Sequence, residues 1–308
     1  MLKRPHFPSV IDASLMSSFL SCPRKCELEY FHHYKPRAPN IHLHAGGAYA
    51  SAMEAARKAF YLHGRTAQDS IALGIGALMK HYGSFECPSD SAKSLERMCG
   101  AFEYYFTEYP LETDHAVPIT LPGGAKGIEF SAAEPLPIDN PETGEPLLYV
   151  GRFDALCTFA GGTYGLDDKT TSQLGASWPR QWDLRRQFTG YCWLAEQAGI
   201  HVDGFLIRGI SILKTKYDTL QPRTYRPEWM ISEWYNQTLR DVTRMIGLWK
   251  GGYWDMSLDE ACNSFGGCIF RQVCQSTPAN RENWLNTGYE RRAWSPVTRK
   301  ETLLEGGE

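Results

Sequence analysis

Two acidic residues and a lysine follow a pattern that could hold a divalent cation. Asp154 comes directly after Gly151-Arg152-Phe153, and Asp167 and Lys169 flank Asp168 a little further along the chain. Carboxylates held close together repel one another unless a cation offsets their charge. Mg²⁺ or Mn²⁺ would do so with oxygen ligands, and would lower the pKa of a bound water. We therefore expect Asp154 and Asp167 to bind one of these ions, and Lys169 to position or activate the attacking water.

The segment between these residues predicts a β-hairpin that would bring them together. Apolar and β-branched residues lie on both sides of Gly161-Gly162, which is typical of two strands joined by a tight turn. If these glycines form the loop, Asp154 lies opposite Lys169, and Asp167 shares their face of the sheet. An exposed hairpin with an ordinary Asp–Lys surface pair fits the same residues equally well.

A helix is predicted after the hairpin, over residues 178–198, and Gly199 would end it. Gln187 and Tyr191 are four residues apart, so they lie on one face of this helix. The basic pair Arg185-Arg186 stands beside them.

The ordered set resembles the signature of the PD-(D/E)XK nucleases of the RecB and AddB branch. That branch includes CRISPR-associated iron-sulphur exonucleases and many phage recombination nucleases. The signature is Gly-x-x-Asp, then Asp-x-Lys on the next strand, then Gln-x-x-x-Tyr on the next helix. The matching positions here are Asp154, Asp167, Lys169, Gln187 and Tyr191.

The resemblance implies an α/β fold of the restriction-endonuclease type. Its core would be an αβββαβ mixed sheet flanked by helices, with added helices and a module that holds a metal cluster through cysteines. The implied activity is that of a metal-dependent DNA exonuclease acting in recombination, repair, or phage or CRISPR DNA processing. Two alternatives stay open: an inactive DNA-binding or assembly subunit of the same fold, and a regulatory protein with a four-cysteine zinc site.

A third acidic ligand is predicted from the Ala-rich helix over residues 44–63. Relatives often carry a metal-binding His about four residues after a glycine such as Gly47, but here the aligned positions are Ala50 and Ser51. We expect Glu54, one turn further on, to replace this His as a metal ligand. The carbonyl of Asp168 is expected to be a further ligand. A solvent-facing helix residue is an equally good interpretation of Glu54.

Five of the cysteines lie near the two ends of the chain, and the other four are scattered between them. Nine cysteines, an odd number, argue against a disulfide scaffold. In the iron-sulphur relatives, one N-terminal and three C-terminal cysteines hold a [4Fe-4S] cluster. The corresponding residues here are Cys22, Cys262, Cys268 and Cys274. The gap between the first two C-terminal cysteines is wider than in those relatives, so Zn²⁺ stays an alternative. Cys26 is a further possible ligand.

The overall charge does not indicate a nucleic-acid binder. The net charge is -3 and the pI about 6.3, whereas affinity for DNA normally depends on Lys and Arg. Contact with single- or double-stranded DNA ends therefore requires a local basic lining, although a solvated loop explains the same charges. The candidates are Arg208, Lys214, Lys216, Arg223 and Arg226. A recombination or helicase protein is a further expected partner.

The chain is long enough for one large domain, and we expect a single nuclease domain over residues 1–308. Its parts would be a helical segment (14–110), a catalytic sheet core (115–226), a C-terminal helix with the cysteine segment (227–275) and a tail (276–308). No window has the length of a membrane-spanning helix, and no signal peptide is evident at the N-terminus. A cytoplasmic location without membrane contact is therefore expected.

Overall fold

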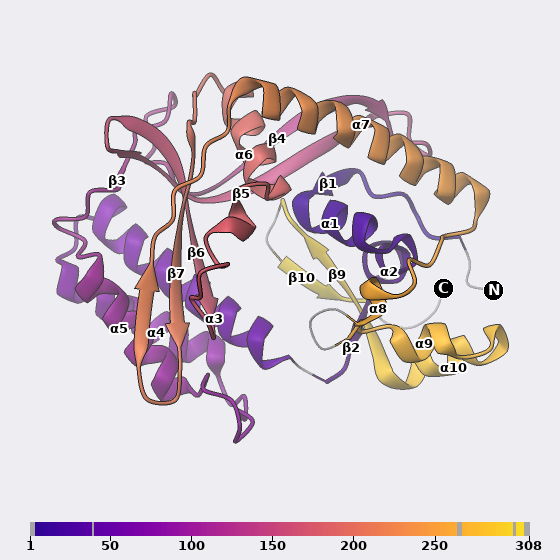
Figure 1. The fold of residues 1–308 in the computed structure, drawn as a ribbon, viewed down its shortest axis with the longest axis horizontal. Coiled ribbons are helices and arrows are strands. Elements are labelled where there is room, and N and C mark those ends of the chain that lie inside the picture. The colour runs from indigo at the N-terminus through magenta and orange to yellow at the C-terminus, as the bar shows by residue number, and fades with distance from the viewer. Residues whose placement is uncertain (1–3, 39, 264–266, 298–299, 305–308) are drawn as a thin grey trace. The chain divides into compact units, whose positions relative to one another are not determined.

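The computed structural model describes residues 4–38, 40–263, 267–297 and 300–304. Residues 298, 299 and 305–308 of the predicted tail lie outside the described residues. The chain divides into two compact units, to which it contributes alternating segments (Figure 1). The first unit consists of Met1–Pro39, Ser131–Gly151 and Ser232–Glu308, and the second unit of Asn40–Phe130 and Arg152–Ile231.

A mixed sheet forms the centre of the second unit. Strand β5 (Pro146–Phe159), whose second half lies in this unit, pairs antiparallel with β6 (Gly162–Thr171). Strand β6 pairs in parallel with β7 (Gly204–Ile212), and β7 pairs antiparallel with β8 (Tyr217–Leu220). Because parallel neighbours need a crossover, helix α6 (Arg186–Gln197) connects β6 to β7. The predicted mixed α/β architecture is confirmed.

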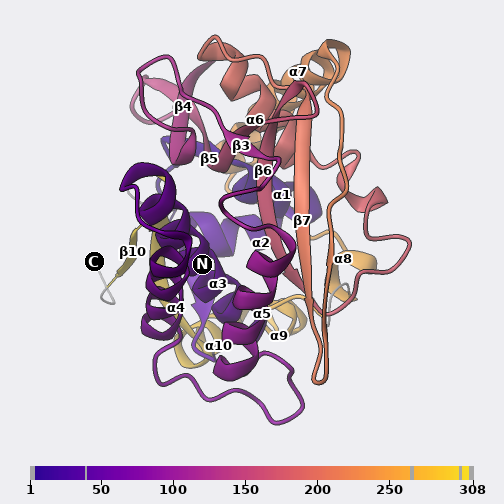
Figure 2. The ribbon, with the colours of Figure 1, turned by 90° about the vertical axis from the view of Figure 1, so that its left-hand side faces the viewer.

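Three helices cover one face of this sheet (Figures 1 and 2). They are α3 (Ile41–Arg57), α4 (Ala67–Tyr82) and α5 (Leu95–Glu108). Side chains of Asn40, Thr66 and Ser94 cap their N-termini by accepting backbone N–H groups. Their apolar sides bury Phe102 and other residues against Ile210 of β7. The opposite face of β7 packs on α6, where the rings of Phe188 and Phe205 stack at 4.6 Å.

The β5–β6 hairpin differs from the predicted register by two residues. Phe159 pairs with Gly162, so the loop residues are Ala160 and Gly161, with φ of 47° and 83°. A two-residue hairpin turn of type I′ requires positive φ at both positions. Gly162 is needed within the strand instead, because a Cβ there would lie 2.6 Å from Oδ2 of Asp203. A shift of two residues leaves every side chain on its predicted face.

The observed boundaries of other elements also differ from the predicted ones. The helix expected over 178–198 begins only at Arg186, after a single 3₁₀ turn at Arg180–Trp182. It ends before Gly199, which has a φ of 75°. Strand β3 (Val117–Pro118) pairs with β5, and β4 (Ile128–Asp139) begins in the second unit and continues into the first.

The first unit contains a parallel strand pair, a small antiparallel sheet and several helices. Strand β1 (Val10–Asp12) pairs in parallel with the first half of β5, and Asp12 caps helix α1 (Ala13–Ser21). Strand β9 (Tyr289–Ser295) pairs antiparallel with both β2 (Tyr34–Pro36) and β10 (Lys300–Leu303).

The remaining helices of the first unit are mostly short. Helix α7 (Glu228–Gly251) begins in the second unit and is the longest. The others are α2 (Pro23–Cys26), α8 (Glu260–Asn263), α9 (Arg271–Gln275) and α10 (Pro278–Gly288). The π-helical segments Glu27–Phe31 and Lys58–Leu62 continue α2 and α3. Over the described part of the chain, no helix is long and apolar enough to cross a membrane.

Candidate metal-binding and catalytic site

Side chains alternate along β6, so Asp167 and Lys169 lie on one face and Asp168 on the other. The first two form an ion pair, with Lys169 Nζ 2.5 Å from Asp167 Oδ2. They line a cavity of about 340 Å³ within the second unit, called here the carboxylate pocket. Its polar lining residues are Glu129, Arg152, Asp154, Asp167, Asp168, Lys169, Thr170, Gln187 and Tyr191. Helix α3 adds Gly46, Tyr49, Ala50 and Met53.

Asp154 reaches the carboxylate pocket from β5. Its Oδ2 accepts a hydrogen bond from the backbone N–H of Asp168 at 3.2 Å. Burial raises the pKa of Asp154, and the nearby Asp168 carboxylate raises it further, against the opposing effect of Lys169. The structure therefore brings Asp154, Asp167 and Lys169 into one pocket.

Negative charge in the carboxylate pocket is only partly compensated. Burial raises the pKa of Asp167 to about 6, and Asp154 adds to the effect while Lys169 opposes it. Burial lowers the pKa of Lys169, but the two carboxylates outweigh this, so its pKa is raised. Asp167 Oδ2 and Asp168 Oδ2 are both buried, and within the described chain each meets a cation, Lys169 or Arg57, as an ion pair without hydrogen-bond geometry. Buried carboxylates with raised pKa values are typical of functional sites.

Glu129 is a third carboxylate in the pocket, and the sequence marks it only as one of the acidic residues that precede the hairpin. Its side chain is 2% exposed, and Arg152 Nη2 lies 2.6 Å from its Oε2. Burial, followed by repulsion from Asp154, raises its pKa to about 7. Its φ of 50° is unusual for a residue with a side chain. The sequence favours Glu54 over Glu129 as the third ligand, because the contact of Glu129 with Arg152 arises only when β4 pairs with β5.

The predicted ligand Glu54 occupies a different place. Its Oε1 lies 2.5 Å from Nζ of Lys58, and its Oε2 lies 3.0 Å from Nη2 of Arg152. Glu54 is not among the residues that line the carboxylate pocket. Arg152 thus bridges Glu54 and Glu129.

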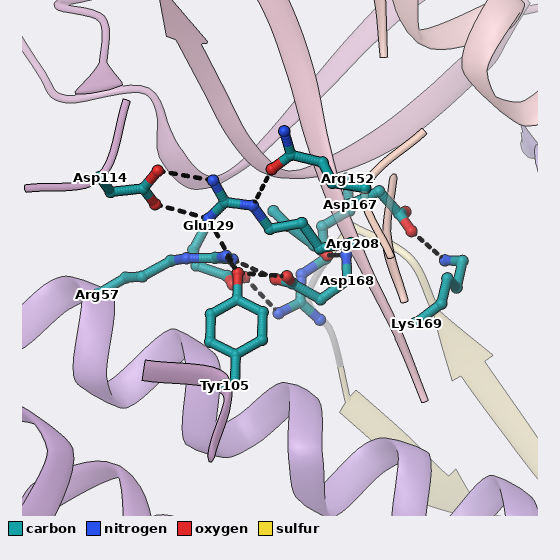
Figure 3. Close-up of polar contacts among 11 residues, drawn as sticks. Arg57, Tyr105, Asp114, Glu129, Arg152, Asp167, Asp168, Lys169 and Arg208 are labelled. Atoms are coloured by element: carbon teal, nitrogen blue, oxygen red, sulfur yellow. Dashed lines mark hydrogen bonds and ion pairs between the residues drawn. The ribbon is translucent and has the colours of Figure 1, made fainter. Parts of the chain in front are cut away.

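Asp168 turns its side chain away from Asp167 and Lys169, towards helices α3 and α5 (Figure 3). Its Oδ2 lies 2.5 Å from Nη1 of Arg57, and its Oδ1 accepts the hydroxyl of Tyr105 at 2.8 Å. The predicted contribution of Asp168 through its backbone carbonyl stays a prediction, whereas its carboxylate is committed to this buried network.

Helix α6 supplies Gln187 and Tyr191 to the pocket, as their spacing predicts. Gln187 Nε2 donates to the hydroxyl of Tyr191 at 3.2 Å. Burial raises the pKa of Tyr191 to about 12, so its hydroxyl stays protonated at neutral pH. Its ring lies 4.9 Å from that of Phe153 on β5. The pair is therefore held by packing and faces the carboxylates.

Two arginines of the predicted basic lining are buried instead of facing a ligand. Arg208 is 2% exposed and binds Asp114 with two nitrogens at 2.6 Å. Arg226 is also 2% exposed and donates to Thr189 and to the carbonyl of Trp182. The prediction was wrong for these two because a charge pattern does not show which arginines have buried partners. Lys214, Lys216 and Arg223 are exposed.

All four predicted cysteine ligands line a second cavity, of about 380 Å³, within the first unit. We call it the thiol pocket, and its cysteines are Cys22, Cys262, Cys268 and Cys274. Sγ of Cys22 accepts the backbone N–H of Ser257 at 3.4 Å. The alternative ligand Cys26 is fully buried, contacts the carbonyl of Leu15, and does not line this pocket.

Neither pocket is a preassembled metal centre. Among the described residues, no three His, Cys, Asp or Glu side chains are grouped as ligands of one ion would be. Burial, together with neighbouring thiols, raises the pKa of Cys274. The carboxylates of the carboxylate pocket would have to move closer together to bind one ion. The same holds for the thiols of the thiol pocket.

Comparison with known proteins shows a similarity of fold. No protein-family model and no curated protein matches the sequence. The fold is similar to the crystal structure of a predicted exonuclease from Eubacterium rectale, with a TM-score of 0.50 and 13% identity, over 83% of this chain and 88% of that one. SSO0001 matches with a TM-score of 0.34 and 13% identity, over 91% of this chain and 89% of that one. That second score is too low to indicate a shared fold.

Proposed function

We propose that this protein is a divalent-metal-dependent DNA nuclease of the PD-(D/E)XK type, acting as an exonuclease. The observation that carries the proposal is that Asp154, Asp167 and Lys169 line one pocket with Gln187 and Tyr191. These five residues come from two strands and the following helix, in the order of the nuclease signature. The similarity to the fold of the Eubacterium rectale protein supports the same assignment.

The donors in the carboxylate pocket fit a hard divalent cation. Asp154 and Asp167 offer buried oxygens whose raised pKa values reflect charge that a cation would neutralise. When bound, Mg²⁺ or Mn²⁺ supplies an activated water and polarises a phosphate oxygen. Lys169 orients that water and stabilises charge on the phosphate. Gln187 and Tyr191 hold the scissile strand by hydrogen bonds.

The thiol pocket adds a second proposal. Four sulfur donors line one cavity and, once moved closer together, would be suitable ligands for a [4Fe-4S] cluster, or for Zn²⁺ as the alternative. Cys22 and the three C-terminal cysteines are far apart in sequence, so such a centre would close a long loop and stabilise the first unit. A visible absorbance band near 400 nm after anaerobic purification would indicate iron-sulphur. Colourless protein with stoichiometric zinc would contradict it.

A second candidate function is that of a DNA-binding or assembly subunit without turnover. The observation that favours it is Ala50, which lines the carboxylate pocket where relatives carry a metal-binding His. In either role, the proposed partners are DNA ends and a recombination or helicase protein. The two candidates differ in cleavage and share DNA binding, so an assay of products separates them.

The decisive assay follows linear DNA labelled at one end, single- or double-stranded, with Mn²⁺, Mg²⁺ or EDTA. We expect metal-dependent release of short products from linear DNA and no cutting of closed circles. Lys169→Ala should keep the fold and reduce cleavage at least about a hundredfold, because a transition-state contact is lost. Lys80→Ala, an exposed lysine on α4, is the matched control.

A fully active Lys169→Ala variant would refute the catalytic assignment. Wild-type protein that binds DNA ends with either metal but releases no products would favour the second candidate function. Cutting of closed circles at the same rate as linear DNA would contradict exonuclease action while leaving the nuclease assignment in place.

A further inference from the structure

We propose that a buried polar network behind β6, centred on the hydroxyl of Tyr105, positions the metal-binding carboxylates. The inference rests on the proposed nuclease function and adds positioning residues to that same site. They are Arg57, Tyr105 and Asp168, none of which has to touch DNA or the ion through its side chain. All three side chains are buried in the second unit.

The hydroxyl of Tyr105 uses its full hydrogen-bonding capacity. It donates to Asp168 Oδ1 at 2.8 Å, and accepts from Arg57 Nη2 at 3.0 Å and Arg208 Nη1 at 3.2 Å. A phenol has one donor and two lone pairs, so no capacity remains for another partner. A hydroxyl with three fixed partners holds each of them in a defined orientation (Figure 3).

Asp168 links this hydrogen-bond network to the carboxylate pocket. Both oxygens of its carboxylate are engaged, Oδ1 by Tyr105 and Oδ2 by Arg57 Nη1. The backbone N–H of the same residue donates to Asp154 Oδ2 at 3.2 Å. Its two neighbours on β6, Asp167 and Lys169, project to the opposite face. Fixing the side chain of Asp168 therefore constrains the backbone of β6 at this residue, and with it the N–H that binds Asp154 and the flanking Asp167 and Lys169.

Stability alone does not explain a charged residue at this position. A well-packed apolar group serves a buried sheet face at least as well as a buried ion pair does, because desolvation offsets the Coulomb attraction. Groups behind a metal's ligands, in contrast, commonly set ligand orientation, and their loss weakens metal affinity or activity ten- to a hundredfold. The network has the geometry for this second role.

The far end of the network supplies an internal control. Arg208 binds Asp114 through two nitrogens at 2.6 Å each, and its Nε donates to Gln221 at 2.6 Å. Asp114 binds Arg208, so breaking this pair disturbs a comparable buried ion pair while the bonds of Asp168 to Arg57 and Tyr105 stay in place. A purely structural role predicts equal consequences at both ends.

The experiment compares Tyr105→Phe with Asp114→Asn in the full chain. For each protein we would measure the melting temperature, the Mn²⁺ dissociation constant by calorimetry, and kcat and KM on linear DNA. Tyr105→Phe should weaken Mn²⁺ binding about tenfold and lower kcat with little change in KM. Asp114→Asn should lower the melting temperature as much or more, yet leave Mn²⁺ affinity within about twofold.

Arg57→Lys keeps the positive charge but loses the nitrogen that donates to Tyr105. This variant tests the positioning role if Tyr105→Phe does not fold. It should weaken Mn²⁺ binding several-fold. Unchanged affinity in these two variants, beside a wild type that binds Mn²⁺ and cuts DNA, would overturn the positioning role alone. Loss of affinity in all three variants in proportion to lost melting temperature would also overturn it. A wild type that neither binds Mn²⁺ nor cuts DNA would overturn the proposed function itself.

Discussion

The two faces of β6 carry acidic residues in opposite electrostatic conditions. Asp168 faces helices α3 and α5, where Arg57 and Tyr105 engage both of its oxygens. Asp167, one position earlier, shares Lys169 with other carboxylates, and its pKa is raised to about 6. The difference shows that an acidic residue type does not by itself indicate a role. The carboxylate that is held by a hydroxyl and a guanidinium stabilises the fold, whereas the one that shares its lysine with Asp154 marks the candidate ion site.

Matched Asp→Asn substitutions at these neighbouring positions give the largest expected contrast. Asp168→Asn should lower the free energy of unfolding by about 3 kcal/mol, because it leaves the Arg57 guanidinium buried without a counter-charge. Asp167→Asn should cost less than about 1 kcal/mol, because it removes a buried charge that is poorly compensated. Urea unfolding in EDTA measures both. Equal losses of stability would contradict the contrast between the faces.

Glu129 and Glu54 sharpen the comparison within the second unit. Glu129→Gln should weaken Mn²⁺ binding about tenfold, as loss of a residue next to the ion does. Glu54→Gln should change it less than about threefold, because Glu54 does not line the pocket and contacts Lys58 and the lining residue Arg152. Calorimetric titration with Mn²⁺ compares the two variants. A larger effect of Glu54→Gln than of Glu129→Gln would instead support Glu54 as the metal ligand, as the sequence predicts.

The pH dependence of stability is the smallest expected effect. The pKa values of Asp167 and Glu129, about 6 and about 7, lie above the ordinary values of 3.8 and 4.5. The folded, metal-free protein therefore binds protons that the unfolded chain has released. Its stability should fall as pH rises from about 5 to 8, and Mn²⁺ should reverse this trend. Thermal melts with EDTA or Mn²⁺ test this, and Glu129→Gln should flatten the metal-free profile.

Local patterns predict much of this arrangement. Alternation along a strand gives Asp154, Asp167 and Lys169 one face even though the turn forms at Ala160-Gly161, two residues from the predicted register. Helical spacing likewise brings Gln187 and Tyr191 together. Such patterns depend on neighbouring residues, and neighbouring residues are what a single sequence displays.

Long-range partners are what the sequence does not show. Arg208 is predicted to face DNA but binds Asp114, which is 94 residues away. Glu129 reaches the carboxylate pocket with a positive backbone φ, a conformation that its residue type does not predict. The site can therefore be predicted as a motif, whereas its third carboxylate and its supporting network depend on the tertiary fold.

Binding of Mn²⁺ to the metal-free protein tests the central claim, that Asp154 and Asp167 share one divalent cation. Calorimetry or the electron paramagnetic resonance of free Mn²⁺ should show saturable binding to the wild type. Asp154→Asn should weaken it more than about tenfold, while Lys80→Ala should not change it. Absence of binding to the wild type, or equal affinity in the wild type and Asp154→Asn, would contradict the account.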